Sequence, residues 1–385
     1  IIDRIELTPL FVPFKEIARK AMGESEGGIG MVHPSDEPWF GGEFVIIKLI
    51  SNEQNTGLGE SSIWLPESGI TPLQVIDVIK KALGKYLIGE NPFNIEKINK
   101  KMDDNVARNE QAKGALDMAC YDLMGKIAGL PACYFMGGRN IDEIPLAALI
   151  PLGSPMLMRG LVRSYYKKGF RSFRLKLGES IKSDFEICQK IRKSLGDDIR
   201  LRVDYNQAYS PSEAIKAIKA IEPFGIDFAE QPVRSDDYLG MAYVQERVDT
   251  PLMNHEGFFS LRDFITLVEL KAVRVLGIQS DRPAGVTKCL QAINYAKCRG
   301  LEVMIHKEPL GIASAMLIHI HAAKCHSIDF ATELFGQEMM EDDLLVKPLD
   351  YSGGTAKVPN GAGWGVDLSE KALEKYATSP TITIK

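Results

Sequence analysis

The feature that most constrains the fold of this chain is a series of short apolar segments that each end in a charged or imidazole side chain. Within residues 173–333 these end residues follow one another at intervals of 28, 26, 26, 25, 25 and 27 positions. A strand, a loop, a helix and a return loop occupy about that length in an alternating β/α chain. The seven end residues are Lys176, Asp204, Glu230, Glu256, Asp281, His306 and Glu333.

This spacing predicts an α/β fold built as a TIM-type barrel of parallel strands. In such a barrel the carboxyl ends of the strands converge on one face, which is where barrel enzymes keep their active sites. The segment IPLAALIPLG, at residues 144–153, is the expected first strand. Side chains that are far apart in the sequence would therefore line one pocket.

The chain has 385 residues, more than the roughly 250 that a barrel needs, so a second domain is expected. Residues 1–138 begin with apolar, β-branched strands and continue with helical patterns, which predicts an N-terminal α+β domain. The barrel is expected over residues 139–350. A C-terminal segment, residues 351–385, is expected to pack back on the first domain.

Residues 22–40 are rich in glycine and long for a connection without structure of its own. We expect them to form a lid over the barrel mouth, with a plain flexible loop as the alternative. As a lid, the segment would bring three side chains to a bound substrate, those of Met31, His33 and Trp39.

The composition, with 45% apolar and 25% charged residues, is that of a globular protein in aqueous solution. The net charge of −5 argues against a nucleic-acid or anionic-membrane partner, and no apolar run approaches the ~20 residues of a membrane span. Six cysteines lack any CxxC spacing, which indicates reduced thiols rather than disulfides or a metal site. The sequence therefore predicts a cytoplasmic protein without a nucleic-acid or membrane partner.

Three carboxylates on consecutive strands form the candidate metal site: Asp204, Glu230 and Glu256. Oxygen ligands without Cys suit Mg2+, with Mn2+ also possible, rather than Zn2+. Unneutralised carboxylates in one pocket repel each other, so a cation is expected among them. Asn206 points the same way as Asp204 on its strand and is expected to support this site or the substrate.

Candidate acid/base groups flank these carboxylates. Arg174 and Lys176 face inward together, and a divalent cation beside Lys176 favours the neutral amine that can accept a proton. Across the pocket, His306 is the expected second base, with Asp281 within reach to fix its tautomer. Glu333 is expected to donate a hydrogen bond if protonated, or to orient water. His255 should point away from Glu256 if its strand stays regular.

Taken together, these motifs resemble the enolase superfamily, within it the mandelate racemase/muconate lactonizing enzyme family, and most closely the mandelate racemase subgroup with its acid sugar dehydratases. The resemblance covers essentially the whole chain, including ALDMACYDLMGKIAGLP, the acids in RVDYN, AEQP and NHEG, and the strands RLK and IHK. It implies a modified TIM barrel, (β/α)7β, under an N-terminal α+β capping domain, and a homo-oligomer. It also implies a substrate carboxylate bound to Mg2+, removal of the α-proton and an enolate intermediate.

Three departures from the family pattern bear on the chemistry. Relatives that lactonize muconate or epimerise dipeptides place a Lys at the end of strand 6, and AVRVLGIQSD has none. Arg174 stands at the first position of the usual Lys-x-Lys pair, so the base role is assigned to Lys176 alone. The segment between Asp281 and Gly285 is short for the family; without a gap there, Gln279 rather than Asp281 becomes the partner of His306.

The predicted function is Mg2+-dependent dehydration of an acid sugar or a related hydroxy acid. Lys176 or His306 would remove the α-proton, and His306 would assist departure of the β-hydroxyl group. The alternative is racemisation or epimerisation at the α-carbon of a hydroxy or amino acid derivative by the same two bases. A lactonizing activity of the muconate cycloisomerase type ranks below both. A non-catalytic carboxylate-binding protein is disfavoured, because the three acids and both bases are all present.

Overall fold

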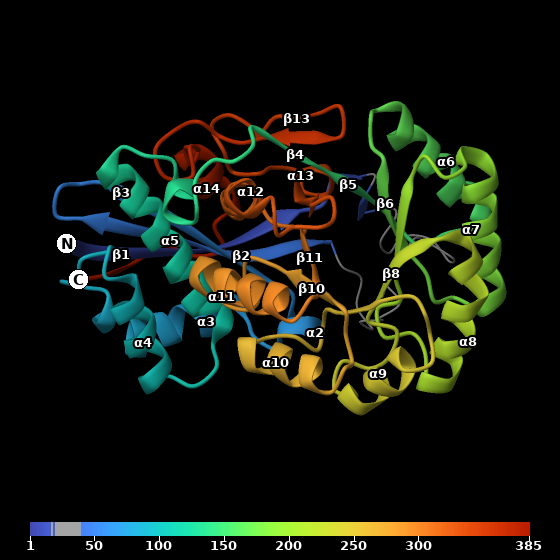
Figure 1. Ribbon diagram of the computed structural model, residues 1–385. Coiled ribbons are helices and arrows are strands. Elements are labelled where there is room, and N and C mark those ends of the chain that lie inside the picture. The colour runs from blue at the N-terminus through green and yellow to red at the C-terminus, as the bar shows by residue number, and fades with distance from the viewer. Residues whose placement is uncertain (17, 20–39) are drawn as a thin grey trace.

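The computed structural model describes residues 1–16, 18–19 and 40–385 of the chain. Its N-terminal domain is built on a four-stranded antiparallel sheet, in which a C-terminal strand lies beside the first strand of the chain. The two termini therefore lie close together, at the end of the molecule away from the barrel helices (Figure 1). In spatial order, the strands are β15 (Ile382–Ile384), β1 (Ile2–Pro13), β2 (Gly41–Ser51) and β3 (Thr56–Ile63).

Helices of the same domain cover this sheet. The longest of them packs against β3 at very short range, because Gly57 and Gly59 leave no side chain between strand and helix. A Cβ atom at Gly59 would lie 2.1 Å from the carbonyl oxygen of Ala115, closer than any real contact. These helices are α2 (Leu65–Ser68), α3 (Pro72–Val78), α4 (Ile95–Asn105) and α5 (Glu110–Ala128), with short turns at Ile79–Leu83, Gly84–Tyr86 and Ala132–Phe135.

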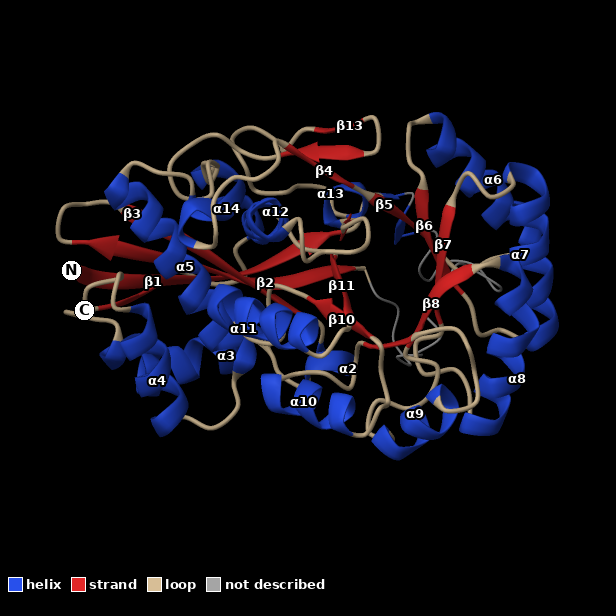
Figure 2. Cartoon of the chain, in the orientation of Figure 1, coloured by secondary structure: helices blue, strands red, loops and turns tan. Residues whose placement is uncertain are grey.

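Eight parallel strands form the predicted barrel, and the modified TIM-barrel fold with a capping domain is confirmed (Figure 2). A bridge between Leu146 and Thr332 joins the first and last strands of this sheet. In order, the strands are β5 (Ala147–Ile150), β6 (Ser172–Lys176), β7 (Arg200–Asp204), β8 (Ile226–Glu230), β9 (Leu252–Asn254), β10 (Val275–Ile278), β11 (Glu302–Lys307) and β12 (Glu333–Leu334).

The helices between these strands bury one face against them, as their periodicity predicts. Two helices differ from this pattern: α11 packs on α5 of the capping domain, and α12 is buried along nearly its whole length. The helices are α6 (Pro155–Lys167), α7 (Ile181–Leu195), α8 (Pro211–Ile221), α9 (Tyr238–Gln245), α10 (Leu261–Glu269), α11 (Gly285–Cys298) and α12 (Gly311–Lys324), with a short turn at Glu222–Phe224.

The expected first barrel strand is divided in two. Glu143–Pro145 forms β4, which joins a separate small sheet, and the barrel begins only at Ala147. β4 pairs with a strand of the C-terminal segment, β14 (Thr355–Lys357). This segment crosses both domains before β15 pairs with β1. The remaining elements are α13 (Gly336–Met339), β13 (Tyr351–Ser352) and α14 (Glu370–Tyr376).

Among the described residues, none of the helices has both the length and the apolar composition needed to cross a membrane.

Candidate active site

The strand ends of the barrel bring the candidate side chains to one face. Lys176, Asp204 and Glu230 are the last residues of β6, β7 and β8. Directly after two of these strands the chain turns through backbone angles that non-glycine residues rarely adopt, with φ of 41° at Asn206 and 35° at Gln231. Such strained positions cluster at functional sites, where the surrounding structure holds them in place.

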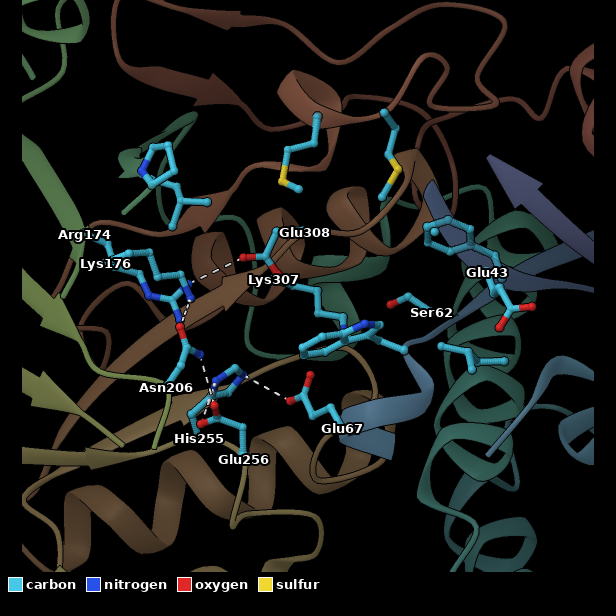
Figure 3. Close-up of a pocket in the computed structure, with 18 residues that line it drawn as sticks. Glu43, Ser62, Glu67, Arg174, Lys176, Asn206, His255, Glu256, Lys307 and Glu308 are labelled. Atoms are coloured by element: carbon cyan, nitrogen blue, oxygen red, sulfur yellow. Dashed lines mark hydrogen bonds and ion pairs between the residues drawn. The ribbon is translucent and has the colours of Figure 1, made fainter. Parts of the chain in front are cut away.

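A pocket opens at this face between the barrel and the capping domain (Figure 3). Part of its wall is charged and comes mostly from the barrel, while an apolar part comes largely from β2, β3 and the region of α13. The ionisable wall residues include Glu67, Arg174, Lys176, His255, Glu256, Lys307 and Glu308, and the apolar ones include Phe44, Ile63, Trp64, Leu149, Met339 and Met340.

Of the three predicted metal ligands, Asp204 and Glu230 are fully buried below this pocket, and Glu256 lies on its wall and is 6% exposed. Cations of the protein reach them: Arg174 Nη2 lies 2.6 Å from Asp204 Oδ2 and 2.5 Å from Glu230 Oε1. Burial by itself would raise the pKa of Asp204, but Lys176 and Arg174 outweigh it and hold that pKa at about 2. The site therefore concentrates negative charge that needs positive partners.

Two buried carboxylate oxygens of this cluster accept no hydrogen bond from the described residues: Oε2 of Glu230 and Oε2 of Glu256. Unsatisfied buried oxygens are rare in proteins, and an ion is one of the usual reasons for them. Carboxylate oxygens are the ligands that Mg2+ prefers. Glu230 and Glu256 thus each offer one oxygen that suits a hard divalent cation, whereas both oxygens of Asp204 accept hydrogen bonds from Arg174, Lys176 and Asn206.

Arg174 and Glu333 form the centre of a buried network of charges. Arg174 Nη1 donates to Glu333 Oε1 at 2.8 Å, and Arg202 Nη2 donates to Glu333 Oε2 at 3.1 Å. Despite its burial, these two arginines hold the pKa of Glu333 below its usual value. The carboxylate form is therefore favoured, and a protonated Glu333 that donates a hydrogen bond is not what this geometry supports.

Lys176 and Asn206 connect the acids to the pocket wall. Lys176 Nζ donates to Asp204 Oδ2 at 2.5 Å and to Asn206 Oδ1 at 2.7 Å. The amide of Asn206 donates in turn to Glu256 Oε1 at 3.0 Å. The amine of Lys176 is thus held at the edge of the carboxylate cluster, where it faces the pocket.

His255 was expected to point away from Glu256, and this expectation is wrong. Its Nδ1 lies 3.0 Å from Glu230 Oε1 and 3.4 Å from Glu256 Oε2, on the same side as both carboxylates. The alternation fails because β9 ends at Asn254, so that His255 already belongs to the turn that follows. Burial and Arg282 oppose the charged imidazole, yet Glu67 and Glu230 outweigh them and raise the pKa of His255 to about 9.

The structure does not form the expected pair of His306 and Asp281. Asp281 Oδ2 instead lies 2.8 Å from Lys307 Nζ and accepts a hydrogen bond from Ser62 at 3.1 Å. Asp281 could not follow the strand register, because β10 ends at Ile278 and the loop carries its side chain toward the capping domain. Gln279 does not bond to His306 either: its side chain contacts His255, Arg282 and Lys307.

His306 lies below the pocket wall rather than on it. Its ring lies tilted against that of His255, with centroids 4.5 Å apart and an interplanar angle of 59°, and its Nδ1 is 3.8 Å from Glu230 Oε1. The other ring nitrogen, Nε2, faces the backbone of Gly277 and has no hydrogen-bond partner in the described parts of the chain. Burial, reinforced by the neighbouring His255, lowers the pKa of His306 well below its usual value.

Several wall residues were not singled out from the sequence. Lys307 and Glu308 follow His306 directly, and Glu308 Oε1 lies 3.5 Å from Arg174 Nη1. Glu67, from α2 of the capping domain, forms an ion pair with Arg282 from the loop after β10. Their position in the sequence could have identified three of them, because Lys307, Glu308 and Arg282 all lie within four residues of a strand end. The expected contact residues Met31, His33 and Trp39, and all of the expected lid except Phe40, lie outside the described residues.

Comparison with known families agrees with this geometry. Residues 41–137 match the model of the mandelate racemase/muconate lactonizing enzyme N-terminal domain, and residues 157–372 match that of the enolase C-terminal domain-like family. The chain belongs to the mandelate racemase/muconate lactonizing enzyme family of the enolase superfamily. The family resemblance read from the sequence is thus confirmed, whereas the assignment to an acid sugar dehydratase-like subgroup is not.

Members of this family that resemble the chain include racemases and epimerases. The N-succinyl-L-Arg/Lys racemase of Bacillus cereus is 30% identical to this chain, over 86% of this chain and 89% of its own length. The crystal structure of this racemase superposes with a TM-score of 0.89 at 27% identity, over the whole of both chains. The hydrophobic dipeptide epimerase of Enterococcus faecalis is 34% identical over 72% of this chain and 79% of its own. A crystal structure of dipeptide epimerase from Enterococcus faecalis complexed with Mg and the dipeptide L-Leu-L-Tyr superposes with a TM-score of 0.84 at 28% identity, covering 95% and 99% of the two chains.

Proposed function

We propose that this protein is a Mg2+-dependent racemase or epimerase that inverts the α-carbon of an amino acid derivative, such as a dipeptide or an N-acylated amino acid. The observation that carries this proposal is the pocket, which combines charged strand ends (Figure 3) with an apolar wall that comes largely from β2, β3 and the region of α13. A substrate that fits such a pocket has a carboxylate at one end and an apolar side chain at the other.

The same wall argues against the predicted dehydration of an acid sugar. The hydroxyl groups of a polyhydroxy acid would face Phe44, Trp64 and Met340, where they could not replace the hydrogen bonds that they make in water. The relatives that are racemases and epimerases support the alternative that the sequence left open. We therefore place inversion at the α-carbon ahead of elimination.

Asp204, Glu230 and Glu256 are the residues that would hold the metal ion, and the unsatisfied oxygens of Glu230 and Glu256 support this assignment. When bound, Mg2+ supplies the Lewis-acid charge that stabilises the negative charge developing on a substrate carboxylate. The protein's own contribution is to place a base beside that carboxylate. Lys176 takes this role, because its amine is fixed at the pocket edge by Asp204 and Asn206.

Inversion needs a proton to leave one face of the α-carbon and another to arrive on the opposite face. Lys176 removes the first proton from the side of β6, so the second must come from the other side of the barrel mouth. β11, which carries His306, lies on that side, since β5 and β12 separate it from β6 in one direction and four strands do so in the other. One acid/base group at the end of each of these two strands would account for a reaction that is reversible and has no leaving group.

The decisive experiment is a substrate screen in buffered D2O with Mg2+, followed by NMR and chiral analysis. The panel contains L,L-dipeptides with apolar side chains, N-succinyl amino acids and acid sugars. We expect α-deuterium incorporation together with inversion for members of the first two classes, and loss of both in excess chelator. A 2-keto-3-deoxy product from an acid sugar, without inversion of any amino acid derivative, would overturn the proposal.

A further inference from the structure

Two of the described wall residues are lysines, and they enter the pocket from different sides. Lys176 is the last residue of β6 and lies beside Arg174, whereas Lys307 is the last residue of β11 and lies toward Ser62 of the capping domain (Figure 3). Only 13% of the Lys307 side chain is exposed, so this cation is largely enclosed by the wall. The pocket thus carries one amine on each side.

The neighbouring imidazole is less well placed to meet a substrate. His306 is 1% exposed and is not part of the pocket wall, and its free Nε2 faces Gly277 within the barrel. The ring of His255 covers it on the side of Glu230. Adjacent residues of an extended strand point to opposite faces, so His306 turns into the barrel while Lys307 remains at its rim.

Fixed contacts hold the amine of Lys307 in position. Its Nζ lies 2.8 Å from Asp281 Oδ2 and donates to Gln279 Oε1 at 3.4 Å, both from the segment that follows β10. Asp281 is held in turn by the hydroxyl of Ser62 on β3. A flexible lysine side chain is thereby confined to one region of the wall, which is the arrangement that a group transferring protons requires.

We propose that Lys307, rather than His306, is the acid/base group that opposes Lys176 in the inversion proposed above. In one direction, the neutral amine of Lys176 takes the α-proton, and the bonding pair of that C–H bond remains on the substrate as an enolate. The ammonium group of Lys307 then delivers a proton to the opposite face of the α-carbon. Lys176 ends as an ammonium and Lys307 as a neutral amine, so the reverse direction exchanges their roles and no other reactant is consumed.

The test uses the Mg2+-loaded enzyme and a dipeptide or N-succinyl amino acid that the wild type inverts. Lys307→Arg keeps the cation and its ion pair with Asp281, but a guanidinium stays protonated and cannot act as a base. We expect inversion to fall about 100-fold or more, while α-deuterium exchange persists for the single stereoisomer whose hydrogen faces Lys176. Lys176→Arg should show the mirror pattern, in which only the other stereoisomer exchanges.

A rescue experiment separates proton transfer from a structural role of the ion pair. In Lys307→Ala, added methylamine should restore part of the inversion, with a rate that rises with amine concentration. A residue that only holds the loop after β10 would give no such response. Lys297→Arg, which alters an ion pair with Asp329 far from the pocket wall, serves as the matched control and should invert substrate as the wild type does.

The variant His306→Asn tests the competing assignment, in which His306 is the second base. If this variant loses exchange of one stereoisomer while Lys307→Arg still inverts both, the imidazole is the second base and the inference is overturned. Wild-type-like inversion by Lys307→Arg overturns it as well, and neither result affects the proposed function. Failure of the wild type to invert any amino acid derivative would reject the proposed function itself, and this inference with it.

Discussion

At the scale of single residues, the carboxylate cluster brings several buried negative charges close together. Asp204 and Glu230 share the guanidinium of Arg174, and Glu230 also faces the ring of His255. Like charges this close are stable only with nearby cations. A divalent ion would reduce the repulsion between these carboxylates most effectively beside the two oxygens of Glu230 and Glu256 that accept no hydrogen bond.

The residue-scale prediction concerns Glu256. Replacing Glu256 with Gln removes one anionic ligand but keeps the shape of the side chain, so we expect Mg2+ affinity to fall by at least about 10-fold, in the range seen when the groups around a metal are altered. Isothermal titration calorimetry measures this change directly, and circular dichroism should show an intact fold. Glu308→Gln is the matched control, because Glu308 lies on the same wall but is not one of the proposed metal ligands. Equal Mg2+ affinity in wild type and Glu256→Gln would refute the assignment.

At the scale of elements, the capping domain is tied to the barrel through one buried side chain. Glu60 on β3 accepts hydrogen bonds from the backbone N–H groups of Leu310, at 2.7 Å, and Ala313, at 3.0 Å. These donors belong to the first turn of α12, where unpaired N–H groups and the helix dipole attract negative charge. Burial nevertheless dominates and raises the pKa of Glu60 to about 7.

This raised pKa predicts a pH dependence of stability with a definite sign. The folded protein binds the Glu60 proton more tightly than the unfolded chain, whose carboxyl has the ordinary pKa of 4.5. The contribution of Glu60 to the free energy of unfolding therefore falls as the pH rises from 4.5 to about 7, by about 3 kcal/mol in total.

Urea unfolding of the wild type and of Glu60→Gln, at several values of pH across this interval, measures the effect. The Gln variant lacks the titrating group, so the wild-type advantage in free energy of unfolding should shrink as the pH rises. A difference that stays constant across the interval would show that Glu60 is ionised throughout.

At the scale of the whole molecule, the C-terminal segment holds the two domains together. Trp364 is fully buried, its indole N–H donates to the carbonyl of Leu58 at 3.1 Å, and its own carbonyl lies 3.1 Å from a ring nitrogen of His319 on α12. Its backbone N–H donates to Asp122 of α5. One residue of the tail thereby contacts the sheet and a helix of the capping domain as well as a barrel helix.

Replacing Trp364 with Ala should therefore destabilise the entire protein rather than one domain. Removing a buried indole leaves a large cavity, and such changes typically cost about 3–5 kcal/mol. Urea denaturation followed by circular dichroism gives the free energy of unfolding, and Tyr134→Ala, at a side chain that is 53% exposed, is the control, with an expected change within about 0.5 kcal/mol. A Trp364→Ala protein as stable as this control would show that the tail is dispensable for domain packing.

The sequence by itself determined the barrel and most of its active face. The regular spacing of strand ends sufficed, because parallel strands joined by helices must place their carboxyl ends together, whatever the loops contain. Asp204, Glu230 and Lys176 could be identified in this way, since each is the last residue of a regular strand. Asn206 was also expected near Asp204 and does contact Lys176, but β7 ends at Asp204, so its position is set by the turn rather than by alternation along the strand.

Only the tertiary structure decided which side chains reach the pocket from the shorter strands. β9 and β10 stop at Asn254 and Ile278, so alternation gives no guide to His255 or to Asp281. The segments after these strands bring His255 to Glu230 and Asp281 to Lys307. The apolar wall could not be predicted from the sequence either, because Phe44 and Met340 come from distant segments that only the packing of the capping domain on the barrel brings together. Strand periodicity is a local property that one sequence displays, whereas loop direction and domain contact depend on packing between segments far apart in the chain.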